Sequence, residues 1–291
     1  MDTIKFQLNA RRQPYGQGAD LSLLNESVGN EVLAFHQKFP DYRVTPLRKL
    51  EFLSQRLGLG SIHIKDEAQR FGLNAFKGLG GSYAMGKYLA ALLERDINTL
   101  SFAELNSPVI KARIKDIVFV TATDGNHGRG VAWAAEQLGL RAVVYMPKGS
   151  SPVRAQNIRR HGAECTITEL NYDDTVRLAA KTAREQGWVL LQDTAWQGYE
   201  QIPTWIMQGY MTLAVEIWQQ LAESGAPMPT HLFLQAGVGS FPVASWDISS
   251  KRCSSRLPPS SSLSRTRRTA CFARQPLMTD CRTASAGICQ P

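Results

Sequence analysis

One lysine, Lys77, lies within a glycine-rich stretch that runs from Phe71 to Gly81 and reads FGLNAFKGLGG. Glycine lets other groups approach the backbone closely. Apolar residues recur at helical spacing directly after the lysine. The pattern therefore predicts that Lys77 stands at the start of an inward-packing helix that ends near Arg95. Because a helix N-terminus disfavours a cation, we expect an amine that is kept partly neutral and able to react.

Two further glycine-rich loops follow predicted strands. Residues 123–130 read TDGNHGRG and precede a helical pattern, and Gly237, Val238 and Gly239 follow the strand expected at 231–234. Backbone N–H groups at such turns bind anions. The first loop lacks the GxGxxG spacing of a dinucleotide site, and the following strand ends in Tyr145–Lys148 without an acid for a ribose. A nicotinamide cofactor is therefore not expected.

Residues 81–87 carry the letters of a phosphate-binding P-loop, GSYAMGK, but Tyr88 stands where Ser or Thr should hold magnesium. The five histidines are scattered and no CxxC occurs, so we expect no metal site. A reactive lysine with two anion sites instead suits pyridoxal 5′-phosphate and an amino-acid substrate. The lysine would join the aldehyde, one loop would hold the phosphate and the other the substrate carboxylate.

Strands alternate with helices between residues 117 and 192. This alternation predicts a parallel sheet with helices on both faces. The expected strands are 117–121, 142–146, 163–168 and 188–192, and the expected helices are 131–138, 152–160 and one capped by Asp173 or Asp174 that ends near Gln186.

The remaining elements are expected on either side of this unit. Before it, periodicity predicts helices at 28–39 and 47–57, a strand at 62–65, and an irregular connector over 96–115. After it, a single long helix is expected over 203–224.

Residues 241–291 follow none of these patterns. They hold ten serines, five prolines and four of the five cysteines, and they carry six of the eight net positive charges. A disordered basic tail that binds nucleic acid is one interpretation. We favour another, in which this segment is out of register with the rest, as a shifted reading frame would produce. Nucleic acid is therefore not an expected partner.

Two features of the sequence indicate the cellular compartment of the protein. The first sixteen residues contain no apolar signal region, and no run approaches membrane-spanning length. Cys165 is the only cysteine before residue 241, which is typical of a reducing cytoplasm, and its apolar strand predicts an inert thiol. We expect a cytoplasmic protein that acts on a small molecule.

Several runs resemble the fold type II, tryptophan-synthase-β-like family of pyridoxal-phosphate enzymes. They include TPL at 45–47, IKDE at 64–67, FGLNAFKGLGG, TDGNHGRGVAWAAEQLG, LNYDDTVRL, QDTAW, IPTWIMQGY and LQAGVG. Within the family they are most similar to the diaminopropionate ammonia-lyases, over about residues 20–240. The resemblance implies two open parallel-sheet α/β domains with the coenzyme between them, and a homodimer.

Domain limits follow from the same resemblance. It implies a large coenzyme-binding domain from residues 1–85 and 194–240, incomplete at its C-terminal end, and a small α/β domain from residues 86–193. Residues 241–291 form the atypical tail, which resembles nothing in the family and leaves out later strands of the large domain.

Site residues are also implied by the resemblance. Lys77 would form the Schiff base, Asn126 would contact the phenolic oxygen of the coenzyme, and residues 237–239 would begin the phosphate loop. The substrate loop would comprise Thr123, Asp124, Gly125, Asn126 and His127.

Two carboxylates are the expected bases. Asp124 lies beside the substrate loop, where related dehydratases usually carry a small residue, and it suits a substrate with a second ammonium group. Asp193 ends another strand, and the family implies one aspartate for each enantiomer of 2,3-diaminopropionate. The structural alternatives are a helix cap for Asp124, a turn residue for Asp193, a hydrogen-bonding role for His127 and a core role for Phe76.

The function expected from the resemblance is elimination of ammonia from 2,3-diaminopropionate, giving pyruvate and two ammonia. Two alternatives stay open. One is a serine or threonine dehydratase of the same fold, and the other is a truncated, non-catalytic product with an exposed sheet edge.

Overall fold

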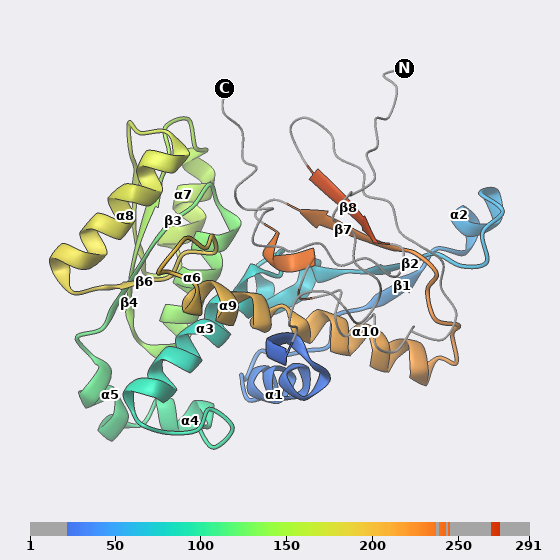
Figure 1. Ribbon diagram of the computed structural model, residues 1–291, viewed down its shortest axis with the longest axis horizontal. Coiled ribbons are helices and arrows are strands. Elements are labelled where there is room, and N and C mark those ends of the chain that lie inside the picture. The colour runs from blue at the N-terminus through green and yellow to red at the C-terminus, as the bar shows by residue number, and fades with distance from the viewer. Residues whose placement is uncertain (1–21, 237–238, 243, 245–268, 274–291) are drawn as a thin grey trace.

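The computed structural model describes residues 22–236, 239–242, 244 and 269–273, and Figure 1 draws these as ribbon. One lobe contains a four-stranded sheet, and the other contains two antiparallel strand pairs and the long helices that pack beneath them. Helix α3 (Lys77–Leu92) runs between the two lobes.

The four-stranded sheet is parallel, as expected, with strand order β5-β4-β3-β6. Val120 lies opposite Val143 on one side and Leu190 on the other. All five residues of β3 are buried, because helices cover both faces of the sheet. The strands are β3 (Val118–Ala122), β4 (Arg141–Met146), β5 (Glu164–Ile167) and β6 (Val189–Leu190).

Helices flank this sheet as the alternation predicts. Helix α8 (Tyr172–Gln186) packs its buried alanines against one face, on which Val118 and Val120 lie. Helices α6 (Asn126–Leu138) and α7 (Pro152–Arg159) cover the other. The N-cap of α8 is Asn171, whose side chain accepts from the Asp174 N–H, so the expected cap at Asp173 or Asp174 is wrong.

In the other lobe, the described strands pair antiparallel, where the resemblance implies a parallel sheet. Strand β1 (Leu47–Lys49) pairs with β2 (His63–Lys65), and β7 (Leu232–Ala236) pairs with β8 (Thr269–Ala273). The helix expected over 47–57 is therefore wrong at its start and is reduced to α2 (Glu51–Arg56). Phe52 and Leu57 are exposed there, so the apolar spacing does not mark a buried helical face. Strand β8 lies within the stretch expected to be irregular.

The long helices form the base of this lobe. Helix α1 (Glu26–Gln37) is capped by Asn25, whose side chain accepts from the Val28 N–H. The helix expected over 203–224 is divided at Tyr210 into α9 (Gln201–Gly209) and α10 (Met211–Glu223). Residues 96–115, expected to be irregular, contain two short helices, α4 (Phe102–Leu105) and α5 (Pro108–Ile114). Elsewhere in the chain there are two 3-10 segments, η1 (Ser22–Leu24) and η2 (Glu67–Gly72).

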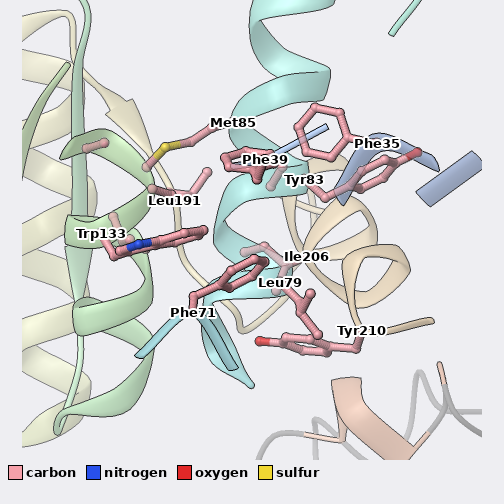
Figure 2. Packing of buried hydrophobic residues seen from close by; sticks show 14 of the residues in the cluster. Phe35, Phe39, Phe71, Leu79, Tyr83, Met85, Trp133, Leu191, Ile206 and Tyr210 are labelled. Atoms are coloured by element: carbon pink, nitrogen blue, oxygen red, sulfur yellow. The ribbon is translucent and has the colours of Figure 1, made fainter. Parts of the chain in front are cut away.

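Aromatic rings fill the core between α1, α3 and α6 (Figure 2). Phe71 stacks on Trp133 with ring centroids 4.2 Å apart, and Phe39 packs against both rings. These contacts attach the segment before Lys77 to the helix that follows β3.

Glycines let α3 contact its neighbours at backbone distance. A Cβ at Gly130 of α6 would lie 2.7 Å from the carbonyl carbon of Lys77. A Cβ at Gly209 of α9 would lie 2.5 Å from the carbonyl oxygen of Leu79. The first turn of α3 is thus held between two helices that only glycine allows so close.

We expect Gly209→Ala to destabilise the protein, because the added methyl meets backbone that cannot rotate away. The free energy of unfolding should fall by about 1–3 kcal/mol, the usual cost of overpacking a core. Urea denaturation followed by circular dichroism measures this. Gly60→Ala is the matched control, since a Cβ there has no neighbour within 4 Å. Equal stability of the two variants would contradict the close-packing interpretation.

Candidate active site

Lys77 forms an ion pair with Asp193. Lys77 is the first residue of α3, and its Nζ lies 2.8 Å from Oδ2 of Asp193, three residues beyond the end of β6. The two side chains are 22% and 8% exposed. The contact joins the two lobes and contradicts the interpretation of Asp193 as a simple turn residue.

Aromatic rings surround the lysine. Its Nζ lies 5.3 Å from the ring centroid of Tyr210 and 5.9 Å from that of Phe76. Phe76 also packs against Phe241, with ring centroids 4.5 Å apart, so Phe76 has the packing role expected for it. The amine is therefore held in a largely apolar surrounding with one carboxylate.

This environment fixes the charge of the pair. Burial alone would lower the pKa of Lys77, but Tyr210 and Asp193 raise it above its usual value. Burial would raise the pKa of Asp193, but His127 and Lys77 lower it to about 2. Both groups are charged at neutral pH, so the expectation of a partly neutral amine is wrong. The carboxylate outweighs the effect of the helix N-terminus because it is in direct contact.

Asp124 lies on the loop after β3, as predicted, but it is exposed and forms no ion pair with Lys77. Its backbone oxygen accepts from Nη1 of Arg154 at 3.0 Å. The N-cap of α6 is Gly125 and receives no side-chain cap, so the helix-cap role for Asp124 is wrong. Among the candidate acids, only Asp193 contacts the lysine directly.

Helix α6 begins earlier than the sequence indicates. It starts at Asn126, so residues 128–130 are helical rather than part of the loop. Asn126 is exposed in the first turn, and Thr123 is buried and accepts from the Gly125 N–H at 3.0 Å. The predicted substrate loop is thus a tight turn that leads directly into the helix N-terminus.

His127 has the hydrogen-bonding role expected for it. Burial lowers its pKa, so the imidazole is neutral at pH 7. Its Nε2 lies 2.8 Å from the Leu191 carbonyl oxygen and therefore carries the proton that it donates there. Nδ1 has no hydrogen bond within the described part of the chain and lies 3.8 Å from Oδ2 of Asp193.

Sequence reasoning missed the groups that support Asp193. The Tyr199 hydroxyl accepts from the Gln192 N–H and donates to the Leu190 carbonyl oxygen. The Gln192 side chain accepts from the Ala122 N–H, and the Ser240 hydroxyl donates to the Asp193 carbonyl oxygen. Gln192 and Tyr199 lie close to Asp193 in the sequence, but Ala122 and Ser240 come from other parts of the chain, so no spacing signal predicts the complete set of contacts.

The predicted phosphate loop is described only at its end. Gly237 and Val238 lie outside the described residues, and Gly239 has a φ of +92°, which favours glycine. No group of three or more His, Cys, Asp or Glu side chains that could hold a metal occurs among the residues the structure describes. Within the same residues, no helix is long and apolar enough to cross a membrane.

The family model for "Pyridoxal-phosphate dependent enzyme" matches residues 38–254. The chain belongs to this family. Pyridoxal 5′-phosphate is thus its coenzyme, and the fold is the α/β fold of type II that the motifs predict.

Within this family, the chain is similar to proteins named diaminopropionate ammonia-lyase. The diaminopropionate ammonia-lyase of Salmonella typhimurium is 76% identical over 240 residues, and that of Escherichia coli K12 is 49% identical. Each match covers 82% of this chain but only 59% of the relative, so the chain spans less than two thirds of their length. The apo crystal structure of the E. coli enzyme superposes with a TM-score of 0.77 and 47% identity, covering 86% of this chain and 67% of that one.

The residues around Lys77 fit the family coenzyme. An aldehyde coenzyme attaches through an amine, and the Lys77 amine lies near two aromatic rings, that of Phe76 directly before α3 and that of Tyr210 at the junction of α9 and α10. Nδ1 of His127, 3.8 Å from Oδ2 of Asp193, is buried without a hydrogen bond within the described residues. Buried polar atoms normally have partners, so this atom is consistent with a ligand that carries polar groups.

We expect Asp193→Asn to make Lys77 more reactive. The negative charge of Asp193 raises the pKa of the amine, so without that charge the lowering effect of burial would prevail more. At pH 8 its acetylation by limiting acetic anhydride should speed up by about tenfold, the factor that one pKa unit gives. Peptide mass spectrometry measures this, with the exposed Lys181 as internal reference. Asp124→Asn, which alters a carboxylate that does not pair with Lys77, is the control. Unchanged labelling of Lys77 in Asp193→Asn would overturn this account of the pair.

Proposed function

We propose that this chain has the architecture for pyridoxal-phosphate-dependent elimination of ammonia from both enantiomers of 2,3-diaminopropionate, with water, to give pyruvate and two ammonia. The observation that carries the proposal is the contact of Lys77 with Asp193 at the end of β6. The identity to named diaminopropionate ammonia-lyases supports it. The chain spans 59% of the length of these relatives, and the activity is proposed for the architecture that it shares with them.

Coenzyme binding is assigned to four positions besides Lys77. When bound, pyridoxal 5′-phosphate joins the substrate amine and withdraws electrons from the α-carbon. Lys77 is the attachment point, and Asn126, at the exposed start of α6, would contact the ring oxygen. Gly237, Val238 and Gly239 would begin the phosphate loop after β7.

The two aspartates have separate roles in this proposal. Asp193 is ionised at neutral pH, since its pKa lies at about 2, and could accept the α-proton once Lys77 no longer pairs with it. Asp124 lies on the adjoining loop, after β3, and would serve the opposite enantiomer. Either carboxylate complements the second ammonium group of the substrate. Thr123, Gly125 and His127 shape the turn on which Asp124 lies.

A dehydratase acting on hydroxy amino acids is the alternative. The carboxylate at Asp124 favours a dicationic substrate over serine or threonine. A non-catalytic product is the second alternative, because the strands outside the parallel sheet form only the two-stranded pairs β1-β2 and β7-β8 among the described residues.

Domain limits and assembly complete the proposal. Residues 86–193 would form the small domain, and all four strands of the parallel sheet fall within this range. Residues 1–85 and 194–240 would form the coenzyme domain, and the protein would be a cytoplasmic homodimer. The free, buried Cys165, whose pKa is raised by burial, is consistent with a reducing compartment.

Coenzyme attachment is expected at Lys77. Incubation with pyridoxal phosphate, reduction with borohydride and peptide mapping should place the pyridoxyl group on this lysine, and Lys77→Ala should lose the label. Lys87→Ala, which alters a lysine of the same helix that pairs with Glu31, is the control. Labelling spread evenly over surface lysines would argue for a non-catalytic product.

Substrate choice is expected to depend on the two acids. Pyruvate formation should be faster with 2,3-diaminopropionate than with serine. Asp124→Asn and Asp193→Asn should each slow a different enantiomer by about 10²–10⁴-fold, the usual effect of a positioned base. Separate assays on the D and L forms measure this. Faster turnover of serine would favour the dehydratase, and equal loss on both enantiomers would refute the division of roles.

A further inference from the structure

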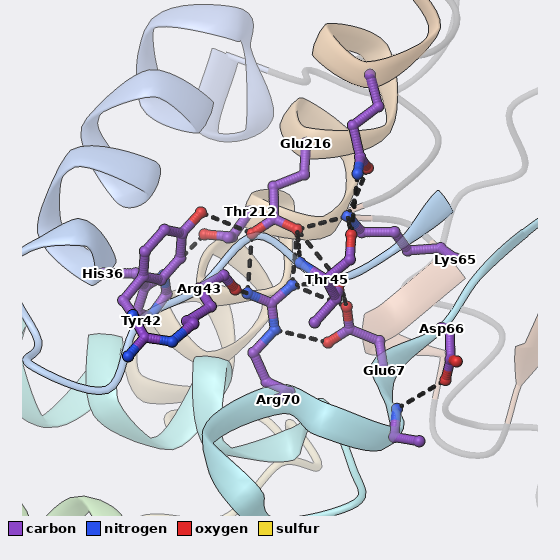
Figure 3. A network of polar contacts seen from close by, with 12 residues as sticks. His36, Tyr42, Arg43, Thr45, Lys65, Asp66, Glu67, Arg70, Thr212 and Glu216 are labelled. Carbon is purple, nitrogen blue, oxygen red and sulfur yellow. Dashed lines mark hydrogen bonds and ion pairs between the residues drawn. The ribbon is translucent and has the colours of Figure 1, made fainter. Parts of the chain in front are cut away.

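A buried network of charges lies outside the lysine site, between α10 and the segment that leads to Lys77 (Figure 3). Glu216 of α10 is fully buried and accepts from both terminal nitrogens of Arg70, each at 2.8 Å. Lys65 of β2 pairs with the same carboxylate at 2.6 Å, and the Tyr42 hydroxyl donates to it at 2.6 Å. The carboxylate of Glu67 accepts hydrogen bonds from Nε and Nη2 of Arg70, each at 2.8 Å.

The network balances its charges internally. Arg70 and Lys65 oppose Glu67 and Glu216, so removing one carboxylate leaves two buried cations against one anion. Such an unpaired charge is costly, whereas the intact pair adds little stability over apolar packing. The network is therefore better suited to fixing a geometry than to stabilising the fold as a whole.

The geometry that it fixes is the path of the chain toward Lys77. Directly after Arg70, Phe71 has a φ of +50°, a conformation that bulky residues rarely adopt. Strain of this kind persists only where the surroundings determine it from several sides. Here the Arg70 guanidinium is held on one side of Phe71, and the Phe71 ring stacks on Trp133 on the other.

The loop beyond Phe71 is held in a similar way. Nη1 of Arg129 donates to the Leu73 carbonyl oxygen at 2.9 Å, and the Leu73 N–H donates back to the Arg70 carbonyl oxygen. Four residues later the chain reaches Lys77, whose backbone contacts Gly130. A shift of Arg70 would therefore be transmitted to the lysine through a short, constrained segment.

We propose that Glu216 is a positioning residue for Lys77, acting through Arg70 and the strained turn at Phe71. The inference rests on the proposed role of Lys77 as the coenzyme attachment point. It adds that a carboxylate on α10, which does not touch the lysine, sets where the amine is presented.

Hydrogen–deuterium exchange tests this without coenzyme. Glu216→Gln keeps the shape of the side chain and removes its charge. We expect amide exchange in residues 71–79 to rise by about tenfold, while exchange in β4 (Arg141–Met146), in the other lobe, stays as in the unaltered protein. Equal acceleration in both regions would mean a general structural role, and no acceleration in either would mean that the network does not act on the loop. Both results overturn the proposal.

Tyr42→Phe provides a milder variant that removes one hydrogen bond to Glu216 and no charge. It should raise exchange in the same loop by about two- to threefold, so the proposal can be tested even if Glu216→Gln does not fold. Tyr145→Phe is the matched control, since Tyr145 lies on β4 of the four-stranded parallel sheet, and it should leave exchange in the loop unchanged.

Borohydride labelling at Lys77 separates this inference from the proposed function. If the unaltered protein is labelled there, Glu216→Gln should lower the yield by about tenfold at limiting pyridoxal phosphate and restore it at saturation. Unchanged yield would overturn the positioning role. If the unaltered protein is not labelled at all, the proposed function fails, and the exchange measurement alone decides whether Glu216 orders the loop.

Discussion

The close approach of three helices at the start of α3 is the constraint on which the rest of the structure depends. Gly130 and Gly209 bring α6 and α9 within van der Waals distance of the backbone of residues 77–80. Because α6 follows a strand of one lobe and α9 belongs to the other, this crossing also fixes how the lobes meet (Figure 1). Lys77 stands at the crossing, and its backbone has little freedom to move.

Electrostatics then defines what the lysine contacts. Among the described residues its single ionic partner is Asp193, which lies just after strand β6 of the parallel sheet. The hydroxyls of Tyr199 and Ser240 donate hydrogen bonds to the backbone of the segment on which Asp193 lies. The remaining neighbours are aromatic rings and the neutral His127. In an apolar surrounding, the pKa of each member of a charged pair changes strongly when another group replaces its partner. This property suits a site where the amine must change its bonding.

The family and the coenzyme could be predicted from contiguous motifs, because each motif is short and its residues act near one another. Lys77 at a helix start, Asp124 after β3 and Asp193 after β6 are all in the predicted places. The antiparallel pairing of β1 with β2 could not be predicted, because residues 47–57 have helical spacing and yet the first of them pair with β2. Backbone pairing with β2, a strand outside the local pattern, outweighed that pattern there.

Local sequence alone determined the glycine-rich lysine loop, the alternation of strands and helices over residues 117–192, and the change of composition at residue 241. Only the tertiary structure decided that Asp193, rather than Asp124, pairs with Lys77, and that Glu216 and Arg70 bury a balanced set of charges behind the loop. The physical reason is that periodicity reports which face of an element is buried, whereas a charge is stabilised by partners more than a hundred residues away. Those partners come together only when the helices pack.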